Sequence, residues 1–270
     1  MEALFEYLGK LGYLIDLTYL VPLLLIAGIL DGIAGGGGVI ALPAYLITGM
    51  PAQNAYACNK IQSGLGTSCS CARFIKDKYI DFKTVLIALP FTILASLGAT
   101  EVIQSIDADI IKIIIISCMP IPVGLMFLRR KLSSGSVMSQ SLNNPTVVLY
   151  AMLAGVILGA YDGFFGPGGG TIAIMLFSML LHYDLRVGNG NGKFIIVVSN
   201  ITATIKYIIG GFMIWHVAIP CALANMAGSY IGASLAVKKG EKLVFPAMIT
   251  VIVLVVVQTV LGLCGIGFGG

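Results

Sequence analysis

The sequence predicts an all-α polytopic membrane protein made of two inverted repeats of five apolar segments each. Hydrophobic residues make up 58% of the 270 residues and charged residues 10%, with a mean hydropathy of +0.98. Soluble domains carry roughly a quarter charged residues, so this composition indicates a lipid environment. The apolar runs have helical length, unlike the short alternating strands of a barrel. In addition, a glycine-rich stretch occurs twice, as DGIAGGGG at 31–38 and as DGFFGPGGGT at 162–171.

Ten apolar segments, each expected to be helical, follow one another along the chain. They are expected at 18–33, 39–50, 55–76, 82–102, 109–128, 146–161, 171–183, 194–209, 214–237 and 243–264. A polar stretch, SSGSVMSQSLNN, separates the first five segments from the last five. We therefore divide the chain into a first repeat at 1–132, a cytoplasmic linker at 133–145 and a second repeat at 146–270.

The distribution of Lys and Arg among the connections predicts the orientation. The basic connections contain Lys76, Lys78, Lys83, Arg129, Arg130, Lys131, Arg186, Lys238, Lys239 and Lys242. If every segment crosses the membrane or pairs into a hairpin, all of these residues fall on one side. That side is cytoplasmic by the positive-inside rule, and both termini then face outward. Because five is an odd number, the second repeat inserts upside down, a common plan in transporters with a midplane site.

The second segment of each repeat is too short to cross a membrane. Segments 39–50 and 171–183 have about 12 residues, or roughly 18 Å of helix, whereas a crossing needs about 20 residues. We therefore expect the first two segments of each repeat to form a re-entrant helical hairpin with its glycines at the tip. Non-helical backbone at that depth is tolerated only inside protein or next to water.

The glycine runs and two lysines predict an anion site between the repeats. Lys60 follows Gly38 by 22 residues and Lys193 follows Gly170 by 23, so each lysine returns to the depth of its glycine loop. Helix N-termini rich in glycine expose N–H groups and a positive dipole end, and ammonium groups add charge. The substrate-binding candidates are Gly35, Gly36, Gly37, Gly38, Asn59, Lys60, Gln62, Gly168, Gly169, Gly170, Thr171, Asn191, Lys193 and Asn200, with Ser63 as a further hydrogen-bonding residue. The alternative for the glycines is close helix packing.

Two aspartates, Asp31 and Asp162, also lie well inside apolar stretches. An intramembrane ionisable group costs on the order of several kcal/mol unless it is paired. One interpretation makes the aspartates structural partners of the lysines, or caps of their own glycine loops. The other makes the lysines substrate ligands and the aspartates proton carriers, so that a proton and an anion are bound and released together. The sequence leaves both interpretations open.

The sequence contains no candidates for enzyme chemistry. We find no Ser/His/Asp set, HExxH or CxxC motif. The six cysteines lie in apolar segments and are interpreted as packing residues, and Cys69 and Cys71 lack the His or Cys companions of a metal site. We therefore predict no catalytic residues, no metal site and no cofactor. The net charge of +4 is attributed to loop orientation and not to nucleic-acid binding.

At this point the motifs resemble those of the TauE/SafE sulfite exporter family, also called the TSUP family. The matching residues are DGIAGGGG, AYACNKIQ at 55–62, YDGFFGPGGGT at 161–171, GNGK at 190–193 with SN at 199–200, and GFMIW with ALANMAGSYIGASLA at 211–236. The resemblance covers nearly the whole chain. It implies transport of sulfur-containing anions such as sulfite, sulfonates or thiosulfate, or of other organic acids, across the plasma membrane.

Together, these features predict a multi-pass secondary transporter of the plasma (inner) membrane that moves a small anion, coupled to protons, by alternating access. The expected partners are the anionic substrate and the lipid bilayer, with no nucleic acid and with a homodimer left open. The alternatives are a permease for a non-sulfur organic anion, a permease for a cation or metal, which two aspartates would suit, and a non-transporting structural membrane subunit.

Overall fold

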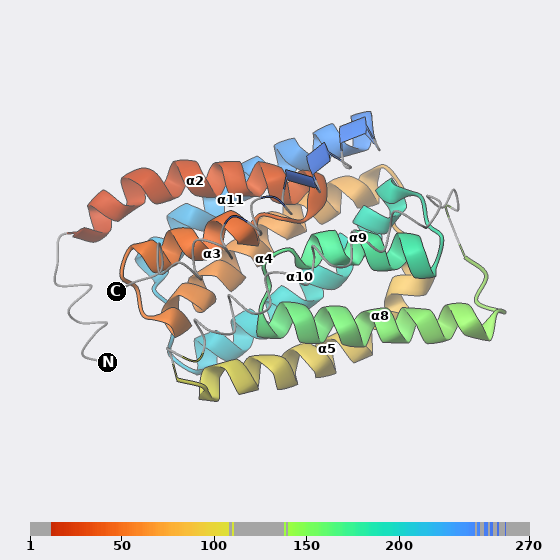
Figure 1. The fold of residues 1–270 in the computed structure, drawn as a ribbon, viewed down its shortest axis with the longest axis horizontal. Coiled ribbons are helices and arrows are strands. Elements are labelled where there is room, and N and C mark those ends of the chain that lie inside the picture. Colours follow the sequence, from red (N-terminus) through yellow and green to blue (C-terminus); the bar gives the residue numbers. More distant parts are fainter. Residues whose placement is uncertain are drawn as a thin grey trace.

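The computed structural model describes residues 12–107, 110, 138 and 140–240, with isolated positions between 242 and 257. Its elements are the helices α2 (Gly12–Ala34), α3 (Gly38–Ile47), α4 (Ala52–Lys76), α5 (Phe82–Ser105), α8 (Pro145–Phe164), α9 (Gly169–Leu180), α10 (Leu185–Ile209) and α11 (Trp215–Lys239) (Figure 1). Five of these described helices, α2, α5, α8, α10 and α11, are long and apolar enough to cross a membrane. The predicted all-helical polytopic membrane fold is confirmed.

Eight of the ten expected segments correspond to described helices. Of the other two, the segment at 109–128 is described only at residue 110, and the segment at 243–264 only at isolated positions up to 257. The repeat boundaries at 1–132, 133–145 and 146–270, and the inversion of one repeat in the membrane, stay predictions.

The helices before the glycine runs are longer than expected. α2 has 23 residues because it begins at Gly12, six residues earlier than expected, and α8 has 20 because it continues through Asp162 and Gly163 to Phe164. Each helix ends where a glycine takes a positive φ, +71° at Gly35 and +91° at Gly166. This conformation is open to glycine but costly for other residues. Asp31 and Asp162 therefore lie in the last helical turn and not in the loop.

A second difference is that α10 begins at Leu185 and not at residue 194, where the sequence predicts its start. The GNGNG run is helical because its glycines lie where the helix touches its neighbours. A Cβ atom on Gly190 would come within 2.0 Å of the Tyr79 carbonyl oxygen, and one on Gly192 within 2.7 Å of the Ala173 Cβ. Close packing thus overrides the poor helix propensity of glycine, about 1 kcal/mol per residue.

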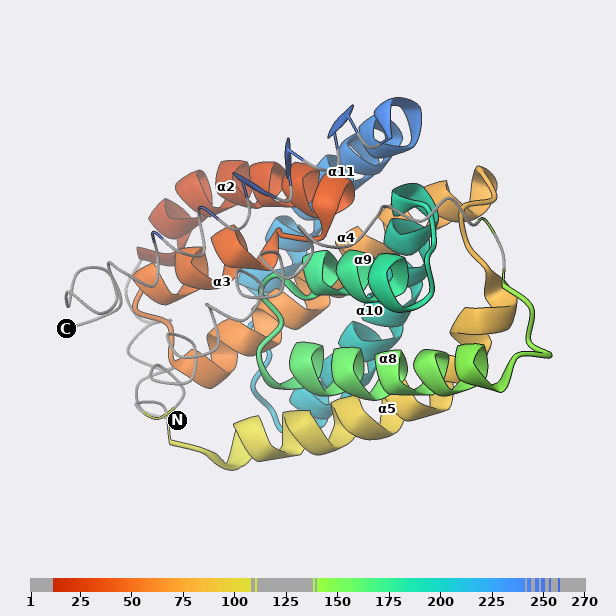
Figure 2. The same ribbon diagram turned by 45° about the vertical axis from the view of Figure 1, so that its right-hand side comes forward.

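The α2–α3 and α8–α9 hairpins run in opposite directions, and their tips meet near the centre of the molecule (Figures 1 and 2). A Cβ atom on Gly35 would lie only 2.3 Å from the Cα of Gly170, so the two tips touch backbone to backbone. The Thr171 hydroxyl also donates a hydrogen bond to the Ala34 carbonyl oxygen, at 2.8 Å. The returning helices, α3 and α9, have 10 and 12 residues. At 1.5 Å per residue they reach roughly 15 and 18 Å, about half a membrane.

Equivalent helices of the two halves make reciprocal contacts. α11 packs along α2, α5 packs along α8, and α4 contacts α10 between these pairs. Both pairs approach closely at glycines: a Cβ atom on Gly232 would meet the Ile29 carbonyl oxygen at 2.1 Å, and one on Gly155 would meet the Ala88 carbonyl oxygen at 2.4 Å. Small residues at such contacts let membrane helices pack through dispersion forces. Each half therefore packs its first helix, α2 or α8, against a long helix of the other half.

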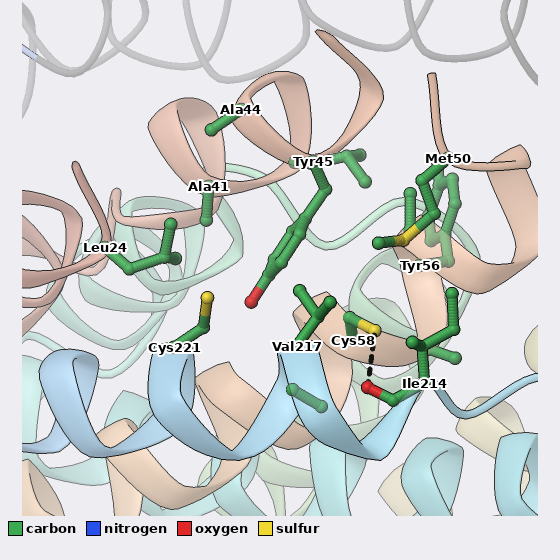
Figure 3. Packing of buried hydrophobic residues seen from close by; sticks show 14 of the residues in the cluster. Leu24, Ala41, Ala44, Tyr45, Met50, Tyr56, Cys58, Ile214, Val217 and Cys221 are labelled. Atoms are coloured by element: carbon green, nitrogen blue, oxygen red, sulfur yellow. Dashed lines mark hydrogen bonds between the residues drawn. The ribbon is translucent and has the colours of Figure 1, made fainter. Parts of the chain in front are cut away.

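Hydrophobic clusters fill the spaces on either side of the hairpin tips. One joins α2, α3, α4 and α11 and is shown in Figure 3; it includes Leu24, Tyr45, Met50, Cys58, Val217 and Cys221. Another joins α5, α8, α9 and α10 around Leu158 and Phe177. The four described cysteines are free, and Cys58, Cys71 and Cys221 are buried, as expected for packing residues; Cys118 and Cys264 lie outside the described residues. The polar groups are thereby concentrated between the clusters.

Candidate functional site

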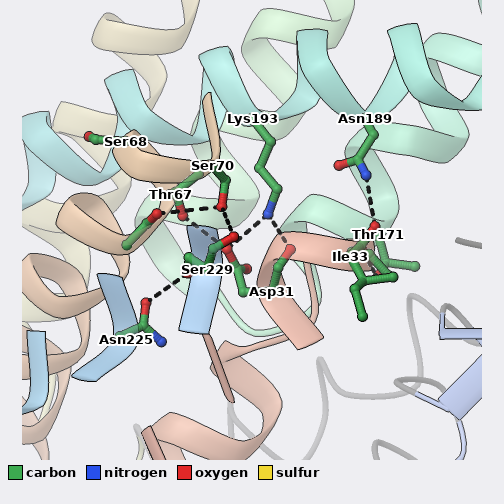
Figure 4. Close-up of polar contacts among 12 residues, drawn as sticks. Asp31, Ile33, Thr67, Ser68, Ser70, Thr171, Asn189, Lys193, Asn225 and Ser229 are labelled. Atoms are coloured by element: carbon green, nitrogen blue, oxygen red, sulfur yellow. Dashed lines mark hydrogen bonds and ion pairs between the residues drawn. The ribbon is translucent and has the colours of Figure 1, made fainter. Parts of the chain in front are cut away.

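Each lysine of the matched set pairs with the aspartate of the other half. Lys60 Nζ on α4 lies 3.1 Å from Asp162 Oδ2 at the end of α8, and it also donates to the Asp162 backbone carbonyl oxygen. Lys193 Nζ on α10 lies 2.8 Å from Asp31 Oδ2 at the end of α2, with the same additional bond to the Asp31 carbonyl oxygen (Figure 4). The sequence grouped these four residues without specifying the partners. The ion pairs tie the two halves together.

All four charges are compensated in this conformation. The side chains of both lysines are 1% exposed, whereas those of Asp162 and Asp31 are 4% and 15% exposed. Removal of one partner from a buried ion pair leaves an uncompensated charge and costs about 3–5 kcal/mol. The conformation therefore corresponds to the structural-pair interpretation. A substrate anion could reach a lysine here only by sharing or displacing its carboxylate.

A cavity with an empty volume of about 310 Å³ lies where the hairpin tips meet α4 and α10. Its lining consists of Asp31, Gly35, Gly38, Asn59, Lys60, Ser63, Thr67, Asp162, Gly166, Gly170, Ile196 and Asn200. Both halves contribute to it. This empty volume includes the open mouth of the cavity; the enclosed space is little larger than a water molecule, so a larger ligand would fit only if the walls move apart.

The cavity brings together half of the predicted site residues. Those in its lining are Asp31, Gly35, Gly38, Asn59, Lys60, Asp162, Gly170 and Asn200. Those outside its lining are Gly36, Gly37, Gln62, Gly168, Gly169, Thr171, Asn191 and Lys193. Most of the second group are neighbours of the first: Lys193 holds Asp31, and Thr171 joins the two tips.

Asn191 lies outside the cavity because its side chain has another contact. Its Oδ1 accepts a hydrogen bond from the backbone N–H of Asp81, at 2.8 Å, where α5 begins. The matched residue two positions before Lys60 is Cys58, whose thiol donates to the carbonyl oxygen of Ile214, 3.8 Å away, where α11 begins. Each side chain fixes the start of the helix that follows the lysine helix of the other half. In this conformation the Asn191 amide oxygen holds the start of α5, and its role as a substrate ligand stays a prediction.

The connection that Asn191 holds is part of a buried polar cluster at the end of the molecule that carries the basic connections. Asp81 Oδ2 accepts hydrogen bonds from the Tyr183 hydroxyl at 2.7 Å and from the Gln140 backbone N–H at 2.9 Å. Burial raises the pKa of the Tyr183 phenol, so that it remains a hydrogen-bond donor at neutral pH. The cluster joins the 133–145 linker to the connections before α5 and α10.

The cavity lining also contains residues that were absent from the predicted site: Gly166, Thr67 and Ile196. The Thr67 hydroxyl donates to Asp31 Oδ2 at 3.2 Å. Helical spacing could have identified both side chains, because Thr67 and Ile196 lie on the same helix faces as Asn59 and Asn200. Ser63, named only as a hydrogen-bonding residue, lies in the lining as well.

Two half-helix N-termini face the cavity. Gly38 begins α3 and Gly170 is in the first turn of α9, and both are lining residues. N–H groups in a first helical turn have no partner within the helix and carry part of the positive dipole end. Lys60 Nζ adds a full charge; a Cβ atom on Gly166 would lie 3.3 Å from it. The arrangement is suited to holding an anion.

The comparisons with known proteins agree with a transport site. A family model described as sulfite exporter TauE/SafE matches residues 20–269. The probable membrane transporter protein YfcA of Escherichia coli (strain K12) is 31% identical over 228 residues, which cover 84% of this chain and 83% of that protein. A probable membrane transporter protein of Haemophilus influenzae is 31% identical over 224 residues, 83% of this chain and 86% of its own. The probable membrane transporter protein YunE of Bacillus subtilis is 24% identical over 263 residues, 89% and 96% of the two chains. No solved structure gives a significant match.

Proposed function

Because the chain belongs to the sulfite exporter TauE/SafE family of membrane transporters, we propose that it is a secondary transporter of a small sulfur-containing anion across the plasma membrane. The observation that carries this proposal is the cavity in which Lys60 and two half-helix N-termini converge. The positive-inside rule supports a cytoplasmic position for the basic end of the molecule. Both hairpin tips would then lie near mid-membrane.

The charges around the cavity support coupling to protons. Two lysines and two helix N-termini, each equivalent to about half a charge, supply about three positive charges. Two ionised carboxylates cancel about two of them. Protonation of Asp31 or Asp162 would release its lysine and leave the site positive enough for an anion. A proton and an anion would therefore be bound and released together, with the net direction set by their gradients.

The cross-half ion pairs support alternating access. Because each pair joins the two halves, opening one pair weakens the contact between them just as an anion enters. Ligand binding and relative movement of the halves are thereby coupled through the same atoms. When the two halves close around the substrate, a lysine would contact the anion instead of its aspartate carboxylate.

A binding panel tests the proposal. Purified protein in detergent is titrated by calorimetry with sulfite, thiosulfate, methanesulfonate, acetate and Mg²⁺, each at pH 6 and pH 8. We expect the sulfur anions to bind and to compete with one another, and methanesulfonate, whose own charge is the same at both pH values, to bind more tightly at the lower pH. Binding of Mg²⁺ without binding of any anion would contradict the proposed anion site. Among the described residues, no group of three or more His, Cys, Asp or Glu side chains could hold a metal ion, and both aspartates already hold a lysine.

A further inference from the structure

The α4 wall of the cavity is polar along its whole length. Asn59, Ser63 and Thr67 all line the cavity and recur at intervals of four residues. This spacing puts them on one face of the helix, beside Lys60. Asn59 is 3% exposed, and its Oδ1 has no hydrogen-bond partner within the described part of the chain. An amide oxygen accepts hydrogen bonds and so does not bind an anion, which leaves the Ser63 hydroxyl and the Asn59 amide N–H groups as the donors that this wall offers.

The α10 wall differs at the matched positions. Counted from Lys193 as the α4 residues are counted from Lys60, these positions hold Gly192, Ile196 and Asn200. Ile196 and Asn200 line the cavity, and Gly192 instead packs against α9. Where α4 presents the Ser63 hydroxyl, α10 presents a branched hydrocarbon. The two walls thus face one small cavity with different chemistry.

Ile196 is placed as a cavity residue and not as a core residue. Glycines aside, it is the one apolar residue in the lining that the described residues form. It is 6% exposed, yet it belongs to none of the three hydrophobic clusters found among those residues. A Cβ atom on Gly169 would lie 3.4 Å from Ile196 Cδ1. Its side chain therefore lies beside the first turn of α9, next to the positive end of that helix.

We propose that this asymmetry selects a small organic sulfonate over a compact inorganic oxyanion, and that Ile196 and Ser63 determine the preference. The charged group is held by Lys60, the two helix N-termini and the α4 wall, and the carbon substituent packs against Ile196. The inference rests on the proposed anion transport, because it assigns the substrate class of that same site. A fully oxygenated anion would leave the Ile196 side chain facing oxygen atoms, without a favourable contact.

Burial of one CH₂ group is worth about 0.8 kcal/mol, or about fourfold in a binding constant. In the wild-type protein, ethanesulfonate should therefore bind several-fold more tightly than methanesulfonate, titrated alongside it, which has the same charge and one CH₂ group fewer. Ile196→Ser, which copies the matched residue of α4, should lower the affinity for ethanesulfonate by about four- to tenfold and leave that for sulfite within about twofold. Ser63→Ile should weaken sulfite more than ethanesulfonate, because it removes a hydroxyl from the polar wall.

The measurement is calorimetric titration of the full chain in detergent with ethanesulfonate, sulfite and sulfate. Ile201→Ser is the matched control, because Ile201 lies on the same helix, 49% exposed and away from the cavity lining; it should leave every affinity unchanged. If Ile196→Ser fails to fold, Ile196→Val removes one methyl group and should give a smaller loss in the same direction.

Two outcomes overturn the inference, and they are distinguishable. If the wild-type protein binds these anions but Ile196→Ser and Ile196→Val leave their order of affinity unchanged, the assignment of Ile196 is wrong and the anion site stands. If no anion binds to the wild-type protein, the proposed function fails and the inference fails with it.

Discussion

The two cross-half ion pairs have the same chemistry but different surroundings. In the Lys60–Asp162 pair, both residues line the cavity, whereas in the Lys193–Asp31 pair only Asp31 does. Asp31 also accepts a hydrogen bond from Thr67, and its side chain is 15% exposed against 4% for Asp162. The residue before Lys60 is Asn59, which lines the cavity, while the residue before Lys193 is Gly192, which packs against α9.

The two copies of the repeated motif therefore have different roles at the cavity. Lys60 is in position to reach an anion directly. Lys193 lies outside the cavity lining and affects the cavity only by balancing the charge of Asp31. Loss of Lys60 should therefore change binding itself, whereas loss of Lys193 should act on binding only through the charge of Asp31.

The largest expected effect is on anion binding after loss of Lys60. Lys60→Ala removes the full charge at the cavity and leaves the Asp162 carboxylate to repel an anion, so we expect affinity to fall by about 100-fold or more, equivalent to about 2.7 kcal/mol. Lys193→Ala should cost less, since Lys193 lies outside the lining. Calorimetric titration with sulfite measures both.

The control is the double variant Lys60→Ala/Asp162→Asn, which removes the unpaired carboxylate. It should recover stability lost in the single variant, because breaking a buried pair costs about 3–5 kcal/mol, but it should not recover binding. Normal sulfite binding by the double variant would show that Lys60 is structural. The site would then depend on the backbone of the glycine loops.

The next effect is on stability, at the helix contacts that join the halves. Gly232→Ala would place a Cβ atom 2.1 Å from the Ile29 carbonyl oxygen, so α2 and α11 must separate, at a cost of about 1–3 kcal/mol. Gly98→Ala on α5 is the matched control: nothing lies within 4 Å of its Cβ position, and the change should stabilise the helix by up to about 1 kcal/mol. Thermal unfolding in detergent measures both. Equal effects would exclude close packing as the cause.

The sequence predicted the helices and the members of the ion pairs but not their geometry. The GPGGG and GGGG runs indicate helix breaks, since adjacent glycines form helix poorly. The helical GNGNG run was missed because its stability comes from contacts with Tyr79 and Ala173, which are distant in sequence from it. The sequence also did not show that each lysine pairs with the aspartate of the other half. A local pattern cannot show which half supplies a carboxylate.

A smaller effect is expected from neutralising the aspartates one at a time. Asp31→Asn and Asp162→Asn should each retain anion binding, because the lysine keeps its charge and gains freedom to meet the anion. If one proton enters with each anion, wild-type affinity changes up to about tenfold per pH unit, and loss of the proton carrier flattens that slope. Titration with methanesulfonate, which stays a monoanion between pH 5 and pH 8 whereas sulfite itself changes protonation there, measures the slope for each variant. Unchanged slopes in both variants would exclude these aspartates as proton carriers.

The smallest effect is expected at a lysine outside the cavity. Lys206 on α10 pairs with Glu101 on α5, and their side chains are 29% and 60% exposed. Exposed pairs contribute about 0–1 kcal/mol, since water compensates either charge when its partner is lost. Lys206→Gln should therefore change the thermal midpoint by no more than a few degrees and sulfite affinity by less than about twofold. Lys60→Gln is the variant to compare it with, because the same substitution then removes a partly exposed lysine of α10 in one case and a buried lysine of α4 in the other. If the two variants lose binding equally, the loss at Lys60 reflects the overall positive potential of the protein, because the two lysines share their charge but not their position in the cavity.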